Sequence, residues 1–211
     1  MKKGTVLYVM DPLCGWCYGF SNVMQEMEQK YAADFDFRVI VGGMITGERI
    51  GPVSNMANYI LGAYKRVEDF SGAKFGEPYL DFLRDGSDIN NSEPPCRAIY
   101  AFGQMQPDKM VDFAHALQLK HFIEGKSFND ENTYRELATA FGLNADEFIE
   151  SMNSEDAKYG TQQDFQWVKA AGIEGFPCTV LHYADQYYLL AQGFQKLESV
   201  EKTMESIMAG N

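Results

Sequence analysis

The chain is short of positive charge and of long apolar runs, and both shortages exclude classes of protein. Lysine and arginine together number 18 against 30 aspartate and glutamate residues, so the formal net charge is -12. Nucleic acids and anionic membrane surfaces need local positive charge in a partner. No stretch approaches the roughly 18 consecutive apolar residues that a transmembrane helix needs. We therefore expect no nucleic acid and no membrane among the partners.

The start of the chain lacks the features of a secretory signal. The apolar run after Met1-Lys2-Lys3 extends only from Thr5 to Met10, and Asp11-Pro12 follows it. A signal peptide needs about 7–15 apolar residues and a cleavage site of small residues. We therefore expect a cytoplasmic protein.

Cysteine and histidine are also scarce. Four cysteines are too few and too unevenly spaced for a secreted disulfide scaffold: Cys14, Cys17, Cys96 and Cys178. A zinc site would need two more ligands beside Cys14 and Cys17. The remaining cysteines are isolated and the three histidines, at 115, 121 and 182, form no short pair. We expect no metal and no cofactor. Glutathione is a candidate co-substrate.

What the chain does contain is enough apolar residue for an ordinary core. Its 211 residues are 45% apolar and 23% charged, which argues for a globular protein and against disorder. This length fits one domain, or one domain that carries a large insertion.

The first fifty residues have the pattern of a β-α-β unit. A buried strand is predicted over Gly4–Met10, an amphipathic helix over Cys17–Ala32 and a second strand over Asp36–Val41. The sequence Cys14-Gly15-Trp16-Cys17 lies at the first strand-to-helix junction. Free N–H groups at a helix start favour a thiolate, and a second cysteine one turn later can close a disulfide. This pattern is typical of a redox site.

No strand pattern occurs between about residues 50 and 155. Helices are expected around Met56–Tyr64, over Pro94–Met105, Lys109–Glu124 and Asp130–Phe141, and after an Asn144 cap, with a Gly- and Pro-containing interruption over Gly72–Pro78. The region from roughly Gly51 to Ser154 is thus predicted to be a helical block.

Strands return near the end of the chain. A helix is predicted over Ala157–Ala171, strands over Cys178–Tyr183 and Tyr187–Leu190, and a last helix over Gln195–Met208. Phe176-Pro177 leads into the first of these strands after a glycine-containing loop, and a proline there is a candidate for a cis bond.

These motifs together resemble the DsbA-like branch of the thioredoxin superfamily. Within it the chain resembles the cytosolic predicted disulfide isomerase, or FrnE-like, group, which neighbours the kappa-class glutathione transferases and the 2-hydroxychromene-2-carboxylate isomerases. The resemblance is carried by Asp11-Pro12-x-Cys14-x-Trp16-Cys17-Tyr18-Gly19, the run Phe122–Asp130, Gly142-Leu143 with Phe148, and Gly172-x-x-Gly175-Phe176-Pro177.

The resemblance implies an α/β fold, namely a thioredoxin fold interrupted by a large all-helical insertion. Residues 1–50 and 155–211 would form the thioredoxin-like domain, and residues 51–154 the helical insertion domain. It also implies that Cys14 is the nucleophile, Cys17 the resolving cysteine and Pro177 the cis-proline. Gly175, Phe176 and Trp16 are the candidate residues for contacts with the substrate.

Other residues keep two interpretations. Trp16 either contacts substrate or only covers the cysteine pair. Asp11 either tunes the thiolate and relays a proton, or forms an Asp-Pro turn. Cys178 is a candidate for a redox role or a small buried hydrophobe, and strand alternation turns its side chain away from the site. Cys96 lies at a predicted helix start, which favours a thiolate.

The leading hypothesis is a thiol–disulfide oxidoreductase that acts on protein or low-molecular-weight disulfides and thiols. The dipeptide Gly15-Trp16 lacks the histidine of strongly oxidising DsbA proteins, which favours reductase or isomerase work. One alternative is a glutathione-dependent transferase or isomerase of the kappa type, although those relatives usually carry serine in place of Cys14. The other is a non-catalytic binding module that the cysteines switch. The sequence does not determine the oligomeric state.

Overall fold

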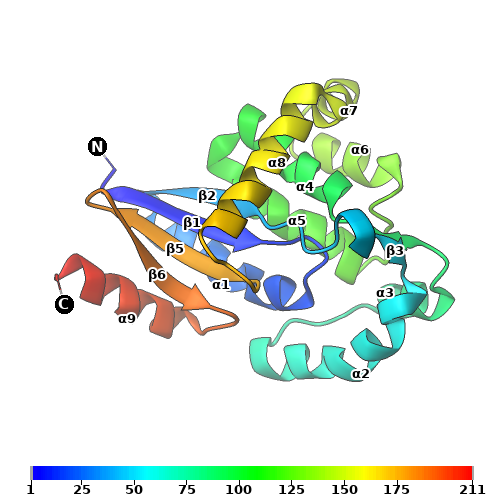
Figure 1. Ribbon diagram of the computed structural model, residues 1–211, viewed down its shortest axis with the longest axis horizontal. Coiled ribbons are helices and arrows are strands. Elements are labelled where there is room, and N and C mark those ends of the chain that lie inside the picture. The colour runs from blue at the N-terminus through cyan, green and yellow to red at the C-terminus, as the bar shows by residue number, and fades with distance from the viewer. Residues whose placement is uncertain (1, 211) are drawn as a thin grey trace.

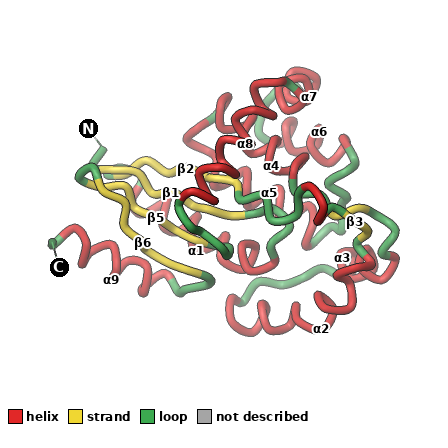
Figure 2. Tube along the Cα trace, in the orientation of Figure 1, coloured by secondary structure: helices red, strands yellow, loops and turns green. Residues whose placement is uncertain are grey.

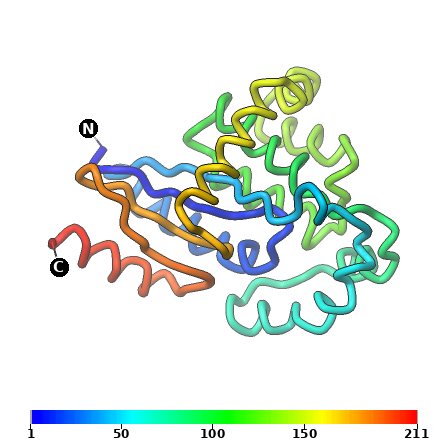
Figure 3. Tube along the Cα trace, viewed as in Figure 1, coloured from blue at the N-terminus to red at the C-terminus, as the bar shows by residue number. Residues whose placement is uncertain are grey.

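A computed structural model describes residues 2–210 and has a four-stranded mixed sheet at its centre (Figure 1). The strand order is β2-β1-β5-β6, with bounds β1 Gly4–Met10, β2 Phe35–Val41, β5 Cys178–Tyr183 and β6 Gln186–Gln192. β1 pairs with β2 in parallel and with β5 antiparallel, and β5 pairs with β6 antiparallel. Figure 3 shows β1 and β5 side by side although they come from opposite ends of the chain.

Both faces of β1 are buried, which explains its continuous apolar sequence. Val6, Tyr8 and Met10 belong to the main core, whereas Leu7 and Val9 pack with Val168 of the opposite layer.

Helices cover the two faces of the sheet. α1 (Gly15–Tyr31) connects β1 to β2 and shares the main core with α9 (Leu197–Met208). α8 (Glu155–Ala170) packs on the other face through Val168. The carboxyl end of β1 therefore lies where α1 begins, and this is the place of the cysteine pair.

The rest of the chain is largely helical, and Figure 2 shows these helices gathered beyond one end and edge of the sheet. The helices are α2 Ser54–Ser71, α3 Glu77–Asp85, α4 Glu93–Met105, α5 Met110–Phe122, α6 Glu131–Ala140 and α7 Ala145–Asn153, with short 3-10 turns at Gly47–Arg49 and Pro107–Lys109. Aromatic side chains of α4 to α7 join the main core, where the rings of Phe102 and Phe113 stack with centroids 4.0 Å apart. Tyr79 of α3 and Phe122 of α5 belong to a second hydrophobic cluster. The predicted α/β fold with a helical insertion is confirmed.

The structure corrects two details of the sequence prediction. Residues 51–154 contain a small antiparallel pair, β3 (Gly51–Pro52) with β4 (Ile89–Asn90), where no strand was expected. Two residues are too few to produce any alternation. The sequence also missed α3, because Pro78 suggested a loop, whereas proline is tolerated in the first turn of a helix.

Most other elements agree with the prediction to within a few residues. The Asn144 cap is present, since its side-chain oxygen accepts the N–H groups of Asp146 and Glu147. Among residues 2–210, no helix is both long enough and apolar enough to cross a membrane.

Candidate active site

Cys14 occupies the N-cap of α1, and its sulfur faces two backbone groups. Sγ accepts the N–H of Cys17 at 3.3 Å. The same sulfur lies 3.6 Å from the carbonyl oxygen of Phe176, which is 162 residues further along the chain. The N–H donor and the positive end of the helix both stabilise negative charge on this sulfur. The structure thus brings the two halves of the predicted site together.

Cys17 differs from Cys14 in its exposure. Cys14 is 7% exposed and Cys17 is fully buried, so of the two only Cys14 can meet a substrate. Burial raises the pKa of Cys17 well above the ordinary thiol value, and the neighbouring Cys14 raises it further. Cys17 therefore needs help to lose its proton.

Tyr8 is a buried neighbour of the pair that the sequence analysis did not single out. Its hydroxyl donates to the carbonyl oxygen of Cys17 at 3.0 Å. The pKa of Tyr8 is raised, first by burial and then by the two cysteines. Strand alternation places Tyr8 on the face of β1 against which α1 packs, and this was the available signal.

The Phe176–Pro177 peptide bond is cis, as the sequence predicted. The loop that holds it is tied to the end of β6, because Gln192 donates to the carbonyl of Gly175 at 3.1 Å and Gly193 donates to that of Pro177 at 2.8 Å. On its other side, the ring of Phe176 lies over Gly42. A Cβ at position 42 would overlap that ring, so only glycine permits this approach.

Asp11 is fully buried, and its carboxylate accepts hydrogen bonds from three residues. The N–H of Leu13 donates at 3.0 Å, which is the expected Asp-Pro turn. The carboxylate also accepts the N–H of Met44 at 2.6 Å and the hydroxyl of Ser92 at 3.0 Å. Burial raises the pKa of Asp11, and these hydrogen bonds oppose the rise. Asp11 therefore forms the turn and also joins the cysteine loop to two distant segments, one after β2 and one before α4.

Cys96 lies in the first turn of α4, and its sulfur is 4.0 Å from the carboxylate of Asp11. Its side chain is fully buried. Burial raises the pKa of Cys96 well above the ordinary value, and the charge of Asp11 acts in the same direction. Burial and the charge of Asp11 therefore outweigh the thiolate-favouring effect of the helix start.

Cys178 faces the opposite side of the sheet from the cysteine pair. It packs with Leu7, Val9 and Val168 beneath α8. Burial raises its pKa to about 11, so the thiol is protonated near neutral pH. The orientation expected from strand alternation is confirmed.

Trp16 is half-buried between two phenylalanine rings. Its ring centroid lies 6.1 Å from that of Phe70 and 6.4 Å from that of Phe194. With Tyr59 and Tyr64 it also lines a small cavity of about 110 Å³. Trp16 therefore packs against the main core and also faces this cavity.

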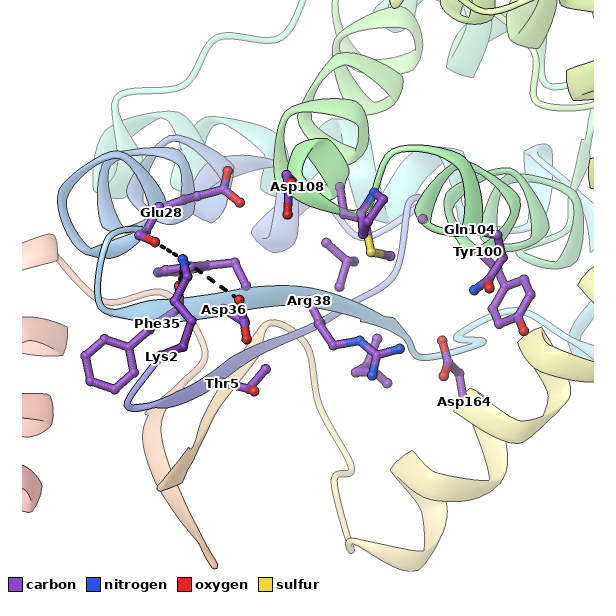
Figure 4. A pocket seen from close by; sticks show the side chains of 17 residues that line it. Lys2, Thr5, Glu28, Phe35, Asp36, Arg38, Tyr100, Gln104, Asp108 and Asp164 are labelled. Carbon is purple, nitrogen blue, oxygen red and sulfur yellow. Dashed lines mark hydrogen bonds and ion pairs between the residues drawn. The ribbon is translucent and has the colours of Figure 1, made fainter. Parts of the chain in front are cut away.

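A larger cavity, of about 620 Å³, opens beside Cys14. Gly175 and Phe176 line it, as does the segment that follows β2. A further cavity, of about 690 Å³, runs along the β2 edge and is lined by residues such as Glu28, Arg38 and Asp164 (Figure 4). None of the four cysteines lines this edge cavity. The cavity beside Cys14 is therefore the one that a substrate of this cysteine would enter.

Candidate metal ligands do not gather elsewhere in the part of the chain that the structure describes. Among residues 2–210, no three His, Cys, Asp or Glu side chains are arranged so that they could hold a metal ion.

Comparison with known proteins agrees with this geometry. A solved structure from Nitrosomonas europaea, named as a candidate protein disulfide isomerase, is 26% identical, with a TM-score of 0.88 and 100% of both chains covered. The cytosolic disulfide reductase DsbM from Pseudomonas aeruginosa is 25% identical, with a TM-score of 0.80, covering 98% of this chain and 100% of that one. A second structure of DsbM contains GSH.

Among curated proteins, the ClpXP adapter protein SpxH of Halalkalibacterium halodurans is 25% identical over 189 residues. The match covers 85% of this chain but only 59% of that protein. The model of the DSBA-like thioredoxin domain matches residues 5–205, which is nearly the whole chain. The chain belongs to the family of DSBA-like thioredoxin domains.

Proposed function

We propose that the protein is a thiol–disulfide oxidoreductase that uses Cys14 as the attacking thiol and Cys17 as the resolving thiol. The observation that carries the proposal is the position of the Cys14 sulfur. It is held between the N–H of Cys17 and the carbonyl of Phe176, at the edge of a 620 Å³ cavity. An attacking sulfur must be within reach of the substrate, and Cys14 borders this cavity and retains 7% exposure, whereas Cys17 is fully buried.

In the first step, the Cys14 thiolate attacks one sulfur of a substrate disulfide. The substrate S–S bond breaks, a Cys14–substrate disulfide forms, and the released substrate thiolate takes a proton from solvent. Gly175 and Phe176 line the cavity, and their backbone groups are the proposed contacts for the substrate chain. Trp16, which lines the smaller cavity of about 110 Å³, is a further proposed contact for the substrate.

In the second step, the Cys17 thiolate attacks the Cys14 sulfur and releases the second substrate thiol. Two electrons have then passed from the enzyme dithiol to the substrate, and the enzyme carries a Cys14–Cys17 disulfide. The proton of buried Cys17 must leave for this step. Asp11, whose charge raises the pKa of Cys17, is the proposed positioning residue and proton acceptor.

The direction of the reaction is proposed to be reduction or isomerisation in the cytoplasm. The dipeptide Gly15-Trp16 carries no histidine that would favour strong oxidation. The similarity to DsbM, a cytosolic disulfide reductase with a second structure that contains GSH, supports the location and supports glutathione as a co-substrate. Cys96 and Cys178 have no part in the proposed cycle.

The proposal is tested by measuring the reduction of insulin and of oxidised glutathione with dithiothreitol as the reductant. Cys14→Ser should lose at least about 100-fold of the activity, because the nucleophile is gone. Cys17→Ser should accumulate a Cys14–substrate disulfide that mass spectrometry detects. Cys178→Ala is the matched control and should retain activity. Undiminished turnover by Cys14→Ser would refute the proposal.

A further inference from the structure

The cavity beside Cys14 is bordered by two cationic side chains. Arg49 comes from the 3-10 turn after β2, and Lys169 comes from the end of α8. Both are exposed. Cys14 lines the same cavity, so a substrate disulfide at Cys14 would lie in a cavity that these two cations border.

These cations are notable because the chain as a whole carries a net charge of -12. Among residues 2–210, neither Arg49 nor Lys169 takes part in an ion pair within 4.0 Å. One acidic side chain, Glu174, borders the same cavity. The cavity border therefore carries two positive charges and one negative charge, against the sign of the whole molecule.

Arg49 is also held in place. Its Nη2 donates to the carbonyl oxygen of Gly43 at 3.1 Å, and Gly43 itself lines the cavity. This single bond leaves the other N–H groups of the guanidinium available to a ligand. A guanidinium binds a carboxylate through two parallel hydrogen bonds, and a lysine ammonium adds a point charge.

We propose that Arg49 and Lys169 bind carboxylates carried beside the substrate disulfide, so that the preferred substrates are anionic disulfides. This inference rests on the proposed function, because it concerns what reaches Cys14. Two sources supply the same chemistry. One is a small peptide disulfide with free carboxylates, such as oxidised glutathione, and the other is a polypeptide cystine flanked by acidic side chains.

The test compares kcat/KM for oxidised glutathione with kcat/KM for the neutral bis(2-hydroxyethyl) disulfide. In Arg49→Gln/Lys169→Gln, the ratio of the first to the second should fall about tenfold or more, because charge-assisted hydrogen bonds to a carboxylate are lost. Lys169→Glu should lower the ratio further than Lys169→Gln. Lys202→Gln, which removes an exposed charge on α9 outside this cavity, is the matched control and should leave the ratio unchanged.

A purely structural role for Arg49 predicts a different result. Arg49→Lys keeps the charge but loses the two parallel hydrogen bonds of the guanidinium, so our proposal expects a fall in the ratio that is clearly smaller than that of Arg49→Gln. A loss as large as that of Arg49→Gln would overturn the proposed role of this charge. Thermal unfolding of each variant shows whether folding is intact.

Two cystine peptides that differ only in flanking Glu or Gln identify the source of the carboxylates. A fall confined to oxidised glutathione supports the small-molecule source, and a fall with the Glu-flanked peptide as well supports a polypeptide source. An unchanged ratio with both probes overturns the inference while leaving the proposed function intact. If the wild-type protein reduced neither glutathione nor the neutral disulfide, the proposed function itself would fail.

Discussion

At the scale of single residues, the buried carboxylate of Asp11 joins the cysteine loop to two distant segments. It accepts hydrogen bonds from Leu13, from Met44 after β2, and from Ser92 before α4. Its charge also raises the pKa of Cys17. Removing the charge should therefore affect both stability and the second chemical step.

We expect Asp11→Asn to lower the free energy of unfolding by about 1–3 kcal/mol, because the amide offers one acceptor in place of two and buries unpaired donors. The decay of a preformed Cys14–substrate disulfide should also slow, because the loss of the proton acceptor outweighs the lowering of the Cys17 pKa that follows from removing the charge, the smallest of the causes that raise it. Urea denaturation and single-turnover mass spectrometry measure the two effects. Asp69→Asn changes an exposed carboxylate and is the control. Equal stability and equal decay in Asp11→Asn and the wild type would contradict this role.

Single residues also show which parts of the candidate site could be predicted from the sequence. Cys14, Cys17 and Pro177 were identified because their spacing and flanking residues form a pattern. The contact of Asp11 with Ser92 spans 81 positions and joins two residue types that are common in turns. No local pattern marks such a pair, because its partners meet only after the helical segment has packed.

At the scale of elements, the end of β2 meets the loop that precedes β5. Gly42 follows β2, and the ring of Phe176 occupies the space where a side chain would lie. A substitution here would push the ring toward the cavity beside Cys14, which Phe176 lines.

Gly42→Ala should destabilise the protein by about 1–3 kcal/mol through overpacking and should raise the KM for disulfides. Gly62→Ala provides the contrast. Gly62 lies inside α2, and apart from its chain neighbours and the nearby backbone of the same helix no heavy atom lies within 4 Å of the position that a Cβ would take. Alanine there should therefore stabilise the protein by about 0.5–1 kcal/mol. Thermal unfolding of both variants measures these shifts. A Gly42→Ala variant as stable and active as Gly62→Ala would show that Phe176 has room to move.

The elements themselves followed from the sequence where their pattern was long. β1, α1 and β2 were predicted because several apolar residues repeat in each. The pair β3–β4 was missed because each strand has two residues, and α3 was missed because Pro78 lies in its first turn. Short elements are set by contacts with their neighbours and not by their own periodicity.

At the scale of the whole molecule, carboxylates from α1 and from the helical segment face each other. Glu28 of α1 lies near Asp108 and Asp112 of the segment that begins at Pro107, and Figure 4 shows Glu28 and Asp108 at the same cavity. Burial raises the pKa of Glu28 from 4.5 to about 7, and the two aspartates act in the same direction. The excess of negative charge therefore raises the pKa of a carboxyl group where α1 meets the helical segment.

Because the pKa of Glu28 is higher in the folded state, folding takes up a proton between about pH 4.5 and 7. The resulting stability is present below that range and is lost as the pH rises through 7. Glu28→Gln should remove this dependence and make the variant about 1–2 kcal/mol more stable than the wild type at pH 8, after allowance for partial solvent screening.

Thermal unfolding at pH 5 and pH 8 measures the difference. Glu26→Gln, which changes an exposed carboxylate on the same helix, should follow the wild type. A Glu28→Gln variant with the same loss of stability between the two pH values as the wild type would contradict the assignment.

The central claim is that Cys14 and Cys17 form a reversible two-electron couple, and a redox titration tests it most directly. The protein is equilibrated in buffers of defined thiol and disulfide ratio, and the cysteines are alkylated and mapped by mass spectrometry. We predict a single disulfide between Cys14 and Cys17 with a two-electron slope and a potential nearer to about -270 mV than to about -120 mV. A disulfide that involves Cys96 or Cys178, or the absence of any disulfide across the whole range, would contradict the account.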